Sequence, residues 1–321
     1  MDMSLAALAT NLLAPTILFF VLGLIAALTR SDLSIPDGAA KIMSIYLLLA
    51  IGFKGGVAVA DSGVTTQLIA SLIAGAALSF VLPFIAFGLL RAMTRLDPVN
   101  AAAVAGHYGS ISIVTFVTAV SLLEAKGIAS EGYLVAVAAV MEVPAIMSAL
   151  WLAARKTGPV VDCSLLRHIV GNGSIVLLIG SFAIGATTGQ DGLAQLKPFI
   201  VVPFTGVLCL FLLDMGLSAG RSLLQNRKEI TGGLLAFGCV MPVVGSMIGW
   251  GAGSLIGLSS GGVFLLMTLC ASASYIAVPA AMRLALPEAK SGIYLSLSLG
   301  VTFPFNLTLG LPLFMALSGW G

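Results

Sequence analysis

The chain has 321 residues, of which 59% are hydrophobic and only 9% are charged, and its mean hydropathy is +1.11. Soluble domains typically carry about 25% charged residues, so this composition excludes an ordinary water-soluble protein and indicates an integral membrane protein. The formal net charge of +2 is scattered along the chain without a basic patch, which excludes a nucleic-acid-binding protein.

Apolar runs long enough to cross a bilayer follow one another along the chain, separated by charges or by Gly, Pro and Asp. A membrane helix needs about 20 apolar residues. No basic segment precedes the first run and no cleavage motif follows it, so we interpret it as a retained helix rather than a signal peptide. The ten predicted transmembrane spans are 11–29, 41–60, 67–91, 99–122, 132–154, 171–189, 198–220, 231–257, 262–285 and 291–317.

The basic residues are distributed unevenly over the connections between these spans. The even-numbered connections hold only Lys126 and Lys197, and Lys54 falls within the second span. Because cytoplasmic connections are enriched in Lys and Arg, we expect a multi-pass protein of the plasma (inner) membrane with both termini outside the cytoplasm. The other 12 of the 15 basic residues lie on the odd-numbered, cytoplasmic side: Arg30, Lys41, Arg91, Arg95, Arg155, Lys156, Arg167, Arg221, Arg227, Lys228, Arg283 and Lys290.

The two halves of the chain match each other at a constant offset. A shift of 164 residues places Gly52 on Gly216 and Ser110 on Ser274. Each repeat holds five helices, and because five is odd the second copy enters the membrane from the opposite face. Inverted repeats are typical of secondary carriers, whose site lies near the midplane where the halves meet.

The fourth and ninth spans each contain a small polar cluster near their centre, at residues 106–112 and 270–275. Gly and Ser weaken a helix and Ser caps a new one, so these clusters predict interruptions, although close helix packing is an alternative. The spans run in opposite directions, so both second halves would begin at the midplane and point their N-termini at one place. Such N-termini bind an anion without any arginine. The predicted substrate site is Gly109, Ser110, Ile111, Ser112, Ser272, Ala273, Ser274 and Tyr275.

A carboxylate lies in the middle of the fifth span, at Glu142. A buried carboxylate in a membrane is functional by default, the alternative being a protonated side chain bonded to neighbouring backbone. Its repeat equivalent is Thr302, and Asn306 follows one turn later. The oxygens of these three, with carbonyls near Gly106 and Ala271, predict a Na⁺ site. A bound Na⁺ would turn the repulsion between Glu142 and the anion into attraction.

Three further residues carry open interpretations. Lys54 and Asp214 could pair if the second and seventh helices pack together, but their different predicted depths argue against direct contact. His107 is either a structural histidine or a ligand. No spacing typical of zinc or of disulfides relates the four cysteines, which we interpret as small buried hydrophobes: Cys163, Cys209, Cys239 and Cys270.

The segment 106–116 (GHYGSISIVTF), together with 272–279 (SASYIAVP), resembles the sodium-dependent bicarbonate permease family of the SbtA type, over essentially the whole chain. The resemblance implies an all-α integral membrane protein of ten helices in two inverted five-helix repeats, with interrupted helices 4 and 9 crossing at the midplane. It also implies a homotrimer and elevator-type movement of a core domain against a gate domain. The corresponding ranges are 1–66 (gate), 67–157 (core), 158–228 (cytoplasmic linker and gate) and 229–321 (core).

Cyanobacterial members engage a PII-like cytoplasmic regulator through a longer segment between the fifth and sixth helices. Here that segment covers only about residues 155–170, which argues against such a partner.

The predicted sites therefore favour a sodium-coupled symporter of a small anion, with Na⁺ as the coupling ion, and the family resemblance implies that it imports bicarbonate. Symport of another small organic or inorganic anion and an anion channel are the alternatives. A cation/proton antiporter usually needs a midplane Asp pair or Asp–Lys pair on the core helices. This sequence has only Glu142 there, which argues against an antiporter. An enzyme is disfavoured because no nucleophile–base or metal cluster occurs.

Overall fold

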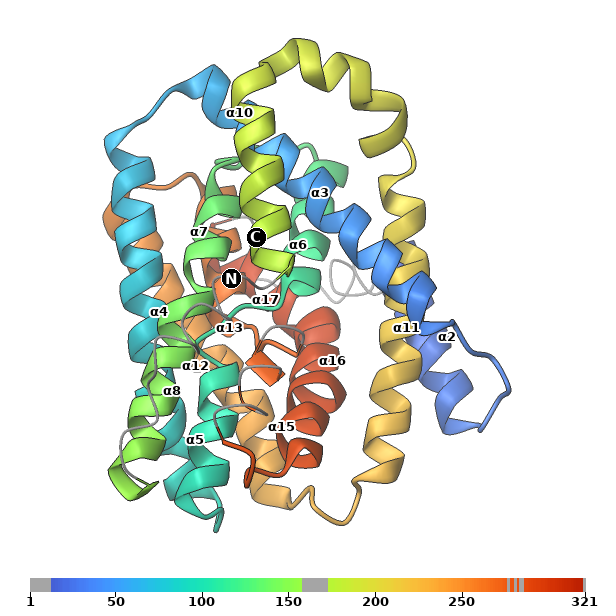
Figure 1. Cartoon of the computed structure of the whole chain (residues 1–321), viewed down its shortest axis with the longest axis vertical. Helices are drawn as coiled ribbons and strands as arrows, with labels where there is room; N and C mark the ends of the chain where they lie inside the picture. Colours follow the sequence, from blue (N-terminus) through green and yellow to red (C-terminus); the bar gives the residue numbers. More distant parts are fainter. Residues whose placement is uncertain (1–12, 158–172, 276–277, 280–281, 283–285, 320–321) are drawn as a thin grey trace.

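The computed structural model of the chain describes residues 13–157, 173–275, 278–279, 282 and 286–319 (Figure 1). Within these ranges every regular element is a helix. Most of the predicted cytoplasmic segment at about 155–170, including Cys163, lies outside the described residues.

Helices occupy all ten predicted spans. Six of them, counting α7 with α8 and α15 through α17 as continuous, are long and apolar enough to cross a membrane, and three shorter helices are also apolar. The number of ten crossings stays a prediction. The helices are α2 (Pro15–Leu28), α3 (Asp37–Ser62), α4 (Thr66–Met93), α5 (Pro98–His107), α6 (Ile113–Ala125), α7 (Leu134–Val140), α8 (Glu142–Thr157), α10 (Gly173–Ile200), α11 (Phe204–Gln225), α12 (Gly232–Ile256), α13 (Ser260–Ala271), α15 (Ser291–Leu297), α16 (Phe303–Phe305) and α17 (Leu311–Leu317), with π-helical turns at Ser298–Thr302 and Asn306–Gly310.

Short polar side chains fix where several helices begin. Thr65, Thr231 and Ser259 each accept a hydrogen bond from a backbone N–H in the first turn of α4, α12 and α13. Asp97 does the same for α5, where its carboxylate accepts from the backbone N–H groups of Val99 and Asn100. Such caps satisfy N–H groups that have no partner inside the helix.

Four helices pack as two close pairs, each drawn from both halves of the chain: α3 with α10 and α2 with α11. A Cβ atom added at Gly52 would lie 2.0 Å from Ser181 Oγ of α10, and one added at Gly216 would lie 2.1 Å from the Phe20 carbonyl oxygen of α2. Only glycine permits these approaches. The two glycines matched at an offset of 164 residues thus make equivalent contacts with helices of the opposite half.

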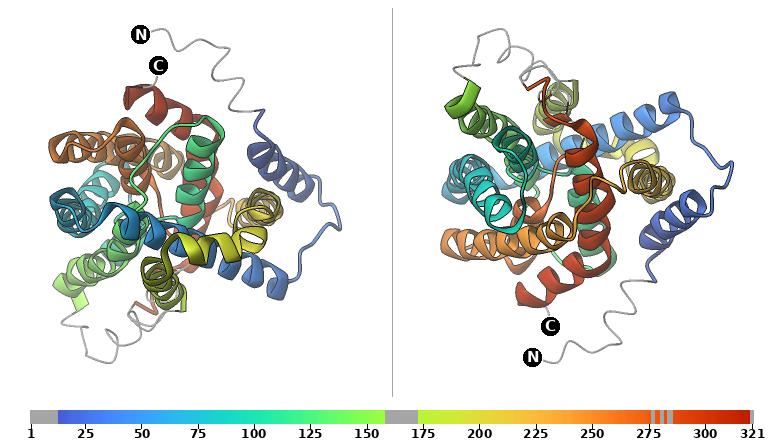
Figure 2. Two further views of the ribbon diagram at one scale, coloured as in Figure 1. Left: turned by 90° about the horizontal axis from the view of Figure 1, so that it is seen from above. Right: turned by 90° about the horizontal axis from the view of Figure 1, so that it is seen from below.

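The remaining helices pack around one another beside these pairs. Contacts join α4 to α5 and α8, α12 to α4 and α13, and α13 to α6 and α17. Figure 2 shows α2 at the edge of the molecule, next to α11, with α3 running past α11 and most of the other helices on the far side of α11. A division into gate and core domains with the boundaries predicted above stays a prediction.

Helix α10 changes direction at Gly189, whose φ of 57° and ψ of −148° are not helical. Glycine adopts a positive φ without steric penalty, so the chain can bend there. The predicted sixth span ends at this residue, and the rest of α10 crosses one end of the molecule (Figure 1).

Candidate functional site

Two helices end abruptly within predicted spans. Helix α5 ends at His107 and α6 begins at Ile113, so residues 108–112 are not helical. Helix α13 ends at Ala271, and residues 272–275 are likewise not helical. Both interruptions therefore occur at the small polar clusters that predicted them.

The two interrupted segments contact each other, although 160 residues separate the paired serines. The Ser112 N–H donates to Ser272 Oγ at 3.0 Å. The Ser274 N–H donates to the His107 carbonyl oxygen at 2.8 Å. The segments therefore meet as predicted, while their depth in the bilayer stays a prediction.

The N-terminus of α6 opens at this meeting point. Ser112 Oγ accepts hydrogen bonds from Thr115 N–H at 3.3 Å and from Thr115 Oγ1 at 2.9 Å. The Phe116 N–H already bonds the Ser112 carbonyl oxygen at 3.0 Å, which leaves the N–H groups of Ile113 and Val114 without an acceptor inside the helix. Helix α6 thus presents backbone donors and the positive end of its dipole.

The predicted substrate residues are buried, except for the half-buried Tyr275. A Cβ atom added at Gly109 would lie 2.3 Å from Pro83 Cγ of α4, so only glycine fits there. The Tyr275 hydroxyl has no hydrogen-bond partner of ordinary geometry among the described residues, although Ser112 lies close to it. The partner half-helix of the ninth span falls largely outside the described residues, which include only Val278, Pro279 and Met282 of it.

Glu142 contacts the first interrupted segment. Ser110 Oγ donates to Glu142 Oε2 at 2.5 Å, and the Glu142 side chain is buried. Helix α7 ends at Val140, and Glu142 is the first residue of α8. The intervening Met141 carbonyl oxygen accepts a hydrogen bond from Ser79 Oγ of α4.

Thr302 contacts the same segment through a tyrosine. Its Oγ1 lies 2.6 Å from the Tyr108 hydroxyl and donates to the Gly238 carbonyl oxygen at 2.8 Å. Since Thr302 has a single hydroxyl hydrogen, Tyr108 is the donor in the pair. The Thr302 hydroxyl is therefore already engaged on both sides, which makes it the weakest member of the predicted Na⁺ ligands.

Asn306 contacts the second interrupted segment. Its Nδ2 donates to the Ala271 carbonyl oxygen at 2.9 Å. Its Oδ1 is buried and has no hydrogen-bond partner among the residues that the structure describes. Thr302 ends one π-helical turn and Asn306 begins the other, and π-turns are frequent at functional sites. An unpaired, buried carbonyl-type oxygen is suited to a hard cation.

The five predicted Na⁺ residues therefore differ in their surroundings. Glu142, Thr302 and Asn306 each hydrogen-bond to a residue in or next to an interruption, and Ala271 accepts from Asn306. Gly106 packs against α8, where an added Cβ atom would lie 2.6 Å from the Ala149 Cβ atom. No group of three or more His, Cys, Asp or Glu side chains that could hold a metal occurs in the described ranges.

His107 is fully buried at the end of α5. Its Nδ1 lies 2.7 Å from the Ala103 carbonyl oxygen, so Nδ1 carries the proton, and its ring stacks on Tyr294 at 4.6 Å between centroids. These contacts hold the histidine within its own helix and against α15, as the structural interpretation expects. Its Nε2 is buried and has no hydrogen-bond partner among the described residues, so the ligand interpretation also stays a prediction.

A family model covers nearly the whole chain: that of the Na⁺-dependent bicarbonate transporter superfamily matches residues 15–319. The chain belongs to this superfamily. The resemblance carried by residues 106–116 is thereby confirmed. No individual curated protein matches the chain. Membership in the bicarbonate transporter superfamily and the six long apolar helices make the chain a multi-pass membrane protein.

Three features of this superfamily member escaped prediction. The fifth span is interrupted at Met141, for which Pro144 was the available signal, because proline fits only the first turn of a helix. The Tyr108 hydroxyl bonds Thr302, a contact between residues 194 apart that no local pattern announces. The π-helical turns of the tenth span also left no mark in its apolar pattern.

Lys54 does not pair with Asp214. Its ammonium forms an ion pair with Glu124 of α6 instead. The difference in predicted depth had argued against the Lys54–Asp214 contact, and the observed partner lies at the end of α6.

Proposed function

We propose that this protein is a sodium-coupled symporter that imports bicarbonate. The observation that carries the proposal is the junction of the two interrupted segments. The Ser112–Ser272 hydrogen bond joins them there, and Ser110 links the same junction to the buried carboxylate of Glu142. Membership in the Na⁺-dependent bicarbonate transporter superfamily supports the choice of both ions.

The anion would bind at the N-terminus of α6. The free N–H groups of Ile113 and Val114 suit the oxygens of bicarbonate, and the helix end contributes roughly half a positive charge. The buried Tyr275 hydroxyl can donate a further hydrogen bond. A site made of backbone N–H groups and hydroxyls binds an anion without a basic side chain.

Sodium would bind beside the anion, among the oxygens of Glu142, Asn306 and Ala271. Two like charges about 4 Å apart repel by about 4 kcal/mol at an effective dielectric constant of 20. An ionised Glu142 without a cation would therefore oppose bicarbonate binding. A Na⁺ ion between the two reverses this effect, so each ion raises the affinity for the other.

Alternating access would follow an elevator-type movement. The close helix pairs α3–α10 and α2–α11 would form the gate, and the helices that carry the interruptions would form the core. The equivalent contacts of Gly52 and Gly216 support two inverted repeats. The proposal includes a homotrimer in the inner membrane with both termini outside, and no PII-like regulator because the connecting segment is short.

A second candidate is symport of another small anion. Backbone N–H groups and hydroxyls bind any small oxyanion or carboxylate, so the site chemistry by itself does not select bicarbonate. An anion channel remains the candidate from a different class, with fluxes that exceed carrier turnover and need no Na⁺.

The deciding experiment is uptake of radiolabelled bicarbonate into proteoliposomes at fixed pH and clamped membrane potential. An inward Na⁺ gradient should drive accumulation, whereas a K⁺ gradient of the same size should not. Unlabelled formate, acetate, nitrate and bicarbonate are added as competitors to test the second candidate. An anion that suppresses labelled uptake more strongly than unlabelled bicarbonate does would be the better substrate. Uptake that is equal with Na⁺ and K⁺ would refute coupling.

A further inference from the structure

A cavity of about 270 Å³ lies between α3 and the end of α6, next to the start of α7. One water molecule takes about 30 Å³ in the liquid, so the cavity has room for a small hydrated anion. It does not belong to the ion site described above. Its main lining residues are Ile51, Lys54 and Ala58 of α3 and Phe116, Val120 and Glu124 of α6.

Helix α6 connects this cavity to the substrate site. Phe116, Val120 and Glu124 follow Ser112 at intervals of four residues, so each lies about one turn from the next on a stripe that winds around the helix. At 1.5 Å per residue, Ser112 and Glu124 are about 18 Å apart along the axis. The cavity therefore begins at Glu124 and ends at Phe116, one turn from the interrupted segment.

The ion pair between Lys54 and Glu124 lies in the exposed part of the cavity lining. Their side chains are 25% and 49% exposed, so water reaches the pair. The Lys54 ammonium also lies 5.3 Å from the ring centroid of Phe204 of α11. The pair links α3, which packs along α10, to α6, which packs on α13. It thus joins helices that belong to different packed groups.

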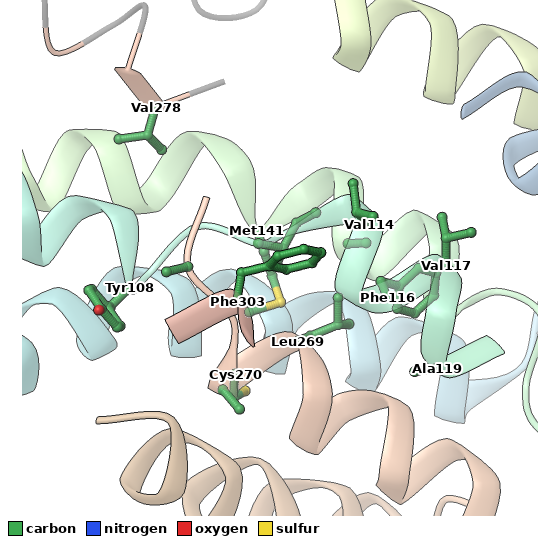
Figure 3. Packing of buried hydrophobic residues seen from close by; sticks show 14 of the residues in the cluster. Tyr108, Val114, Phe116, Val117, Ala119, Met141, Leu269, Cys270, Val278 and Phe303 are labelled. Carbon is green, nitrogen blue, oxygen red and sulfur yellow. The ribbon is translucent and has the colours of Figure 1, made fainter. Parts of the chain in front are cut away.

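Phe116 belongs to the buried part of the cavity lining. Its side chain is 1% exposed and belongs to the buried cluster that Figure 3 shows, with Val117 on the same helix and Leu269 of α13 nearby. Phe116 follows Ser112 by one helical turn, and both side chains are buried. In the conformation described, the substrate site is therefore shielded from water on this side.

We infer that this cavity is the access chamber of the ion site, with the Lys54–Glu124 ion pair as its gate and Phe116 as its floor. The inference rests on the proposed function. Separation of α3 from α6 requires the ion pair to break, and the chamber then opens to water. The anion passes through it, and the chamber is not a second binding site.

The charges around the chamber favour a passage over a fixed anion site. Lys54 is its single cation among the described lining residues, and Glu124 already neutralises it. The second carboxylate, Glu131, accepts hydrogen bonds from Ser259 N at 2.7 Å and Ser259 Oγ at 2.9 Å at the start of α13. No unpaired positive charge is left to retain an anion.

The test uses Val120→Cys as a reporter inside the chamber, in the purified full-length protein. The rate of maleimide labelling is measured on the peptide that carries this cysteine by mass spectrometry. Lys54→Met and Glu124→Gln should each speed labelling about tenfold. The exchange of both charges, Lys54→Glu with Glu124→Lys, should restore the slow rate. Unchanged rates in the single variants, or a fast rate in the exchanged pair, would overturn the gate.

Controls come from the same chain. Lys126→Met removes an exposed positive charge from the connection after α6 and should leave the rate unchanged. The buried thiols of Cys209 and Cys270 report folding, because they stay unlabelled while the helices remain packed. If a variant unfolds, the reporter protein alone still decides: 1 M choline chloride shortens the screening length to about 3 Å and so weakens a solvent-exposed ion pair. The salt should therefore speed labelling, and a constant rate would count against the gate.

The labelling experiment needs neither Na⁺ nor bicarbonate. Absence of Na⁺-driven uptake by the wild type would refute the proposed function and leave the gate result standing. Suppose instead that Na⁺-driven uptake is normal but the labelling rate does not change in the Lys54 and Glu124 variants. That result would refute only the role of the Lys54–Glu124 ion pair as the gate of the chamber.

Discussion

Hydrogen-bond donors suited to an anion and oxygens suited to a cation lie beside the same interrupted segments of this protein. Backbone N–H groups at the start of α6 face outward from a helix end, while Glu142 and Asn306 supply oxygens beside the same interrupted segments. Burial strengthens both effects, because polar groups that lose water interact more strongly with their remaining partners. At the scale of residues, this arrangement supports the proposal that a pair of ions of opposite sign binds here.

Replacement of Glu142 by Gln should abolish coupling. The variant keeps the shape of the side chain and removes its charge, so Na⁺ loses its charged ligand. Na⁺-driven bicarbonate uptake should fall at least 100-fold in proteoliposomes. Glu229→Gln removes a carboxylate that lies 3.9 Å from Lys290 on the protein surface and should retain wild-type uptake. Full uptake by Glu142→Gln would remove this residue from the site.

Replacement of Asn306 by Ala should act on Na⁺ more than on bicarbonate. The unpaired Oδ1 is lost, so the Na⁺ concentration for half-maximal uptake should rise about tenfold. The bicarbonate dependence at saturating Na⁺ should change by less than threefold. Thr308→Ala, in the same π-helical turn, removes a hydroxyl that bonds the Pro304 carbonyl oxygen and serves as the matched control. If both variants raised the Na⁺ concentration for half-maximal uptake equally, a ligand role for Asn306 would be contradicted.

At the scale of elements, the interruptions depend on close packing against intact helices. Gly109 lies against Pro83 of α4, and Ser79 of the same helix bonds the Met141 carbonyl oxygen between α7 and α8. Helix α4 thus contacts two breaks in neighbouring elements. An intact helix that supports broken ones holds their free backbone groups in fixed positions.

Gly109→Ala should distort the first interruption. The added Cβ atom would lie 2.3 Å from Pro83 Cγ, and overpacking of this kind costs about 1–3 kcal/mol. The apparent melting temperature of the protein in detergent should therefore fall by several degrees, together with uptake. Gly88 lies inside α4, where an added Cβ atom would meet no atom within 4 Å. Gly88→Ala should therefore keep or raise the melting temperature. A melting temperature of Gly109→Ala equal to the wild type would show that the segment has room to shift.

At the scale of the whole molecule, the close pairs α3–α10 and α2–α11 use glycine contacts between the two halves of the chain. Helix α3 contacts α6 and α7 much less extensively than it contacts α10, and the chamber with its ion pair lies along this smaller boundary. A boundary that contains a cavity and a hydrated ion pair separates more readily than a long, close helix pair. The proposed movement would therefore occur there.

A cross-link across this boundary should stop transport. Gly55 of α3 faces Val135 of α7, with 3.0 Å between an added Cβ atom and the Val135 Cβ atom. Disulfide geometry needs a Cβ–Cβ distance of about 3.5–4.5 Å, so the two helices must separate by only about 0.5–1 Å to form the bond. Oxidation of the double variant Gly55→Cys/Val135→Cys should block Na⁺-driven uptake, and reduction should restore it. The oxidant should leave uptake by each single variant unchanged. Unimpaired uptake by fully cross-linked protein would exclude movement of α3 against α7.

The sequence by itself determined the class of protein and the address of the interruptions. Scarcity of charge and the length of the apolar runs require a membrane protein, because hydrocarbon excludes unpaired polar groups. The Gly and Ser clusters at 106–112 and 270–275 weaken helices locally, so their effect is readable from neighbouring residues alone. Burial of Glu142 followed in the same way from its place inside an apolar run.

Only the tertiary structure decided which distant groups meet. Lys54 pairs with Glu124, Tyr108 bonds Thr302, and α4 contacts the break at Met141. These partners lie 62 to 194 residues apart, and their contacts depend on how helices are oriented around their axes. In a membrane nearly every helix face is apolar, so the pattern that identifies the buried face of a soluble helix is weak here. Packing through glycines and a few hydrogen bonds sets those orientations instead.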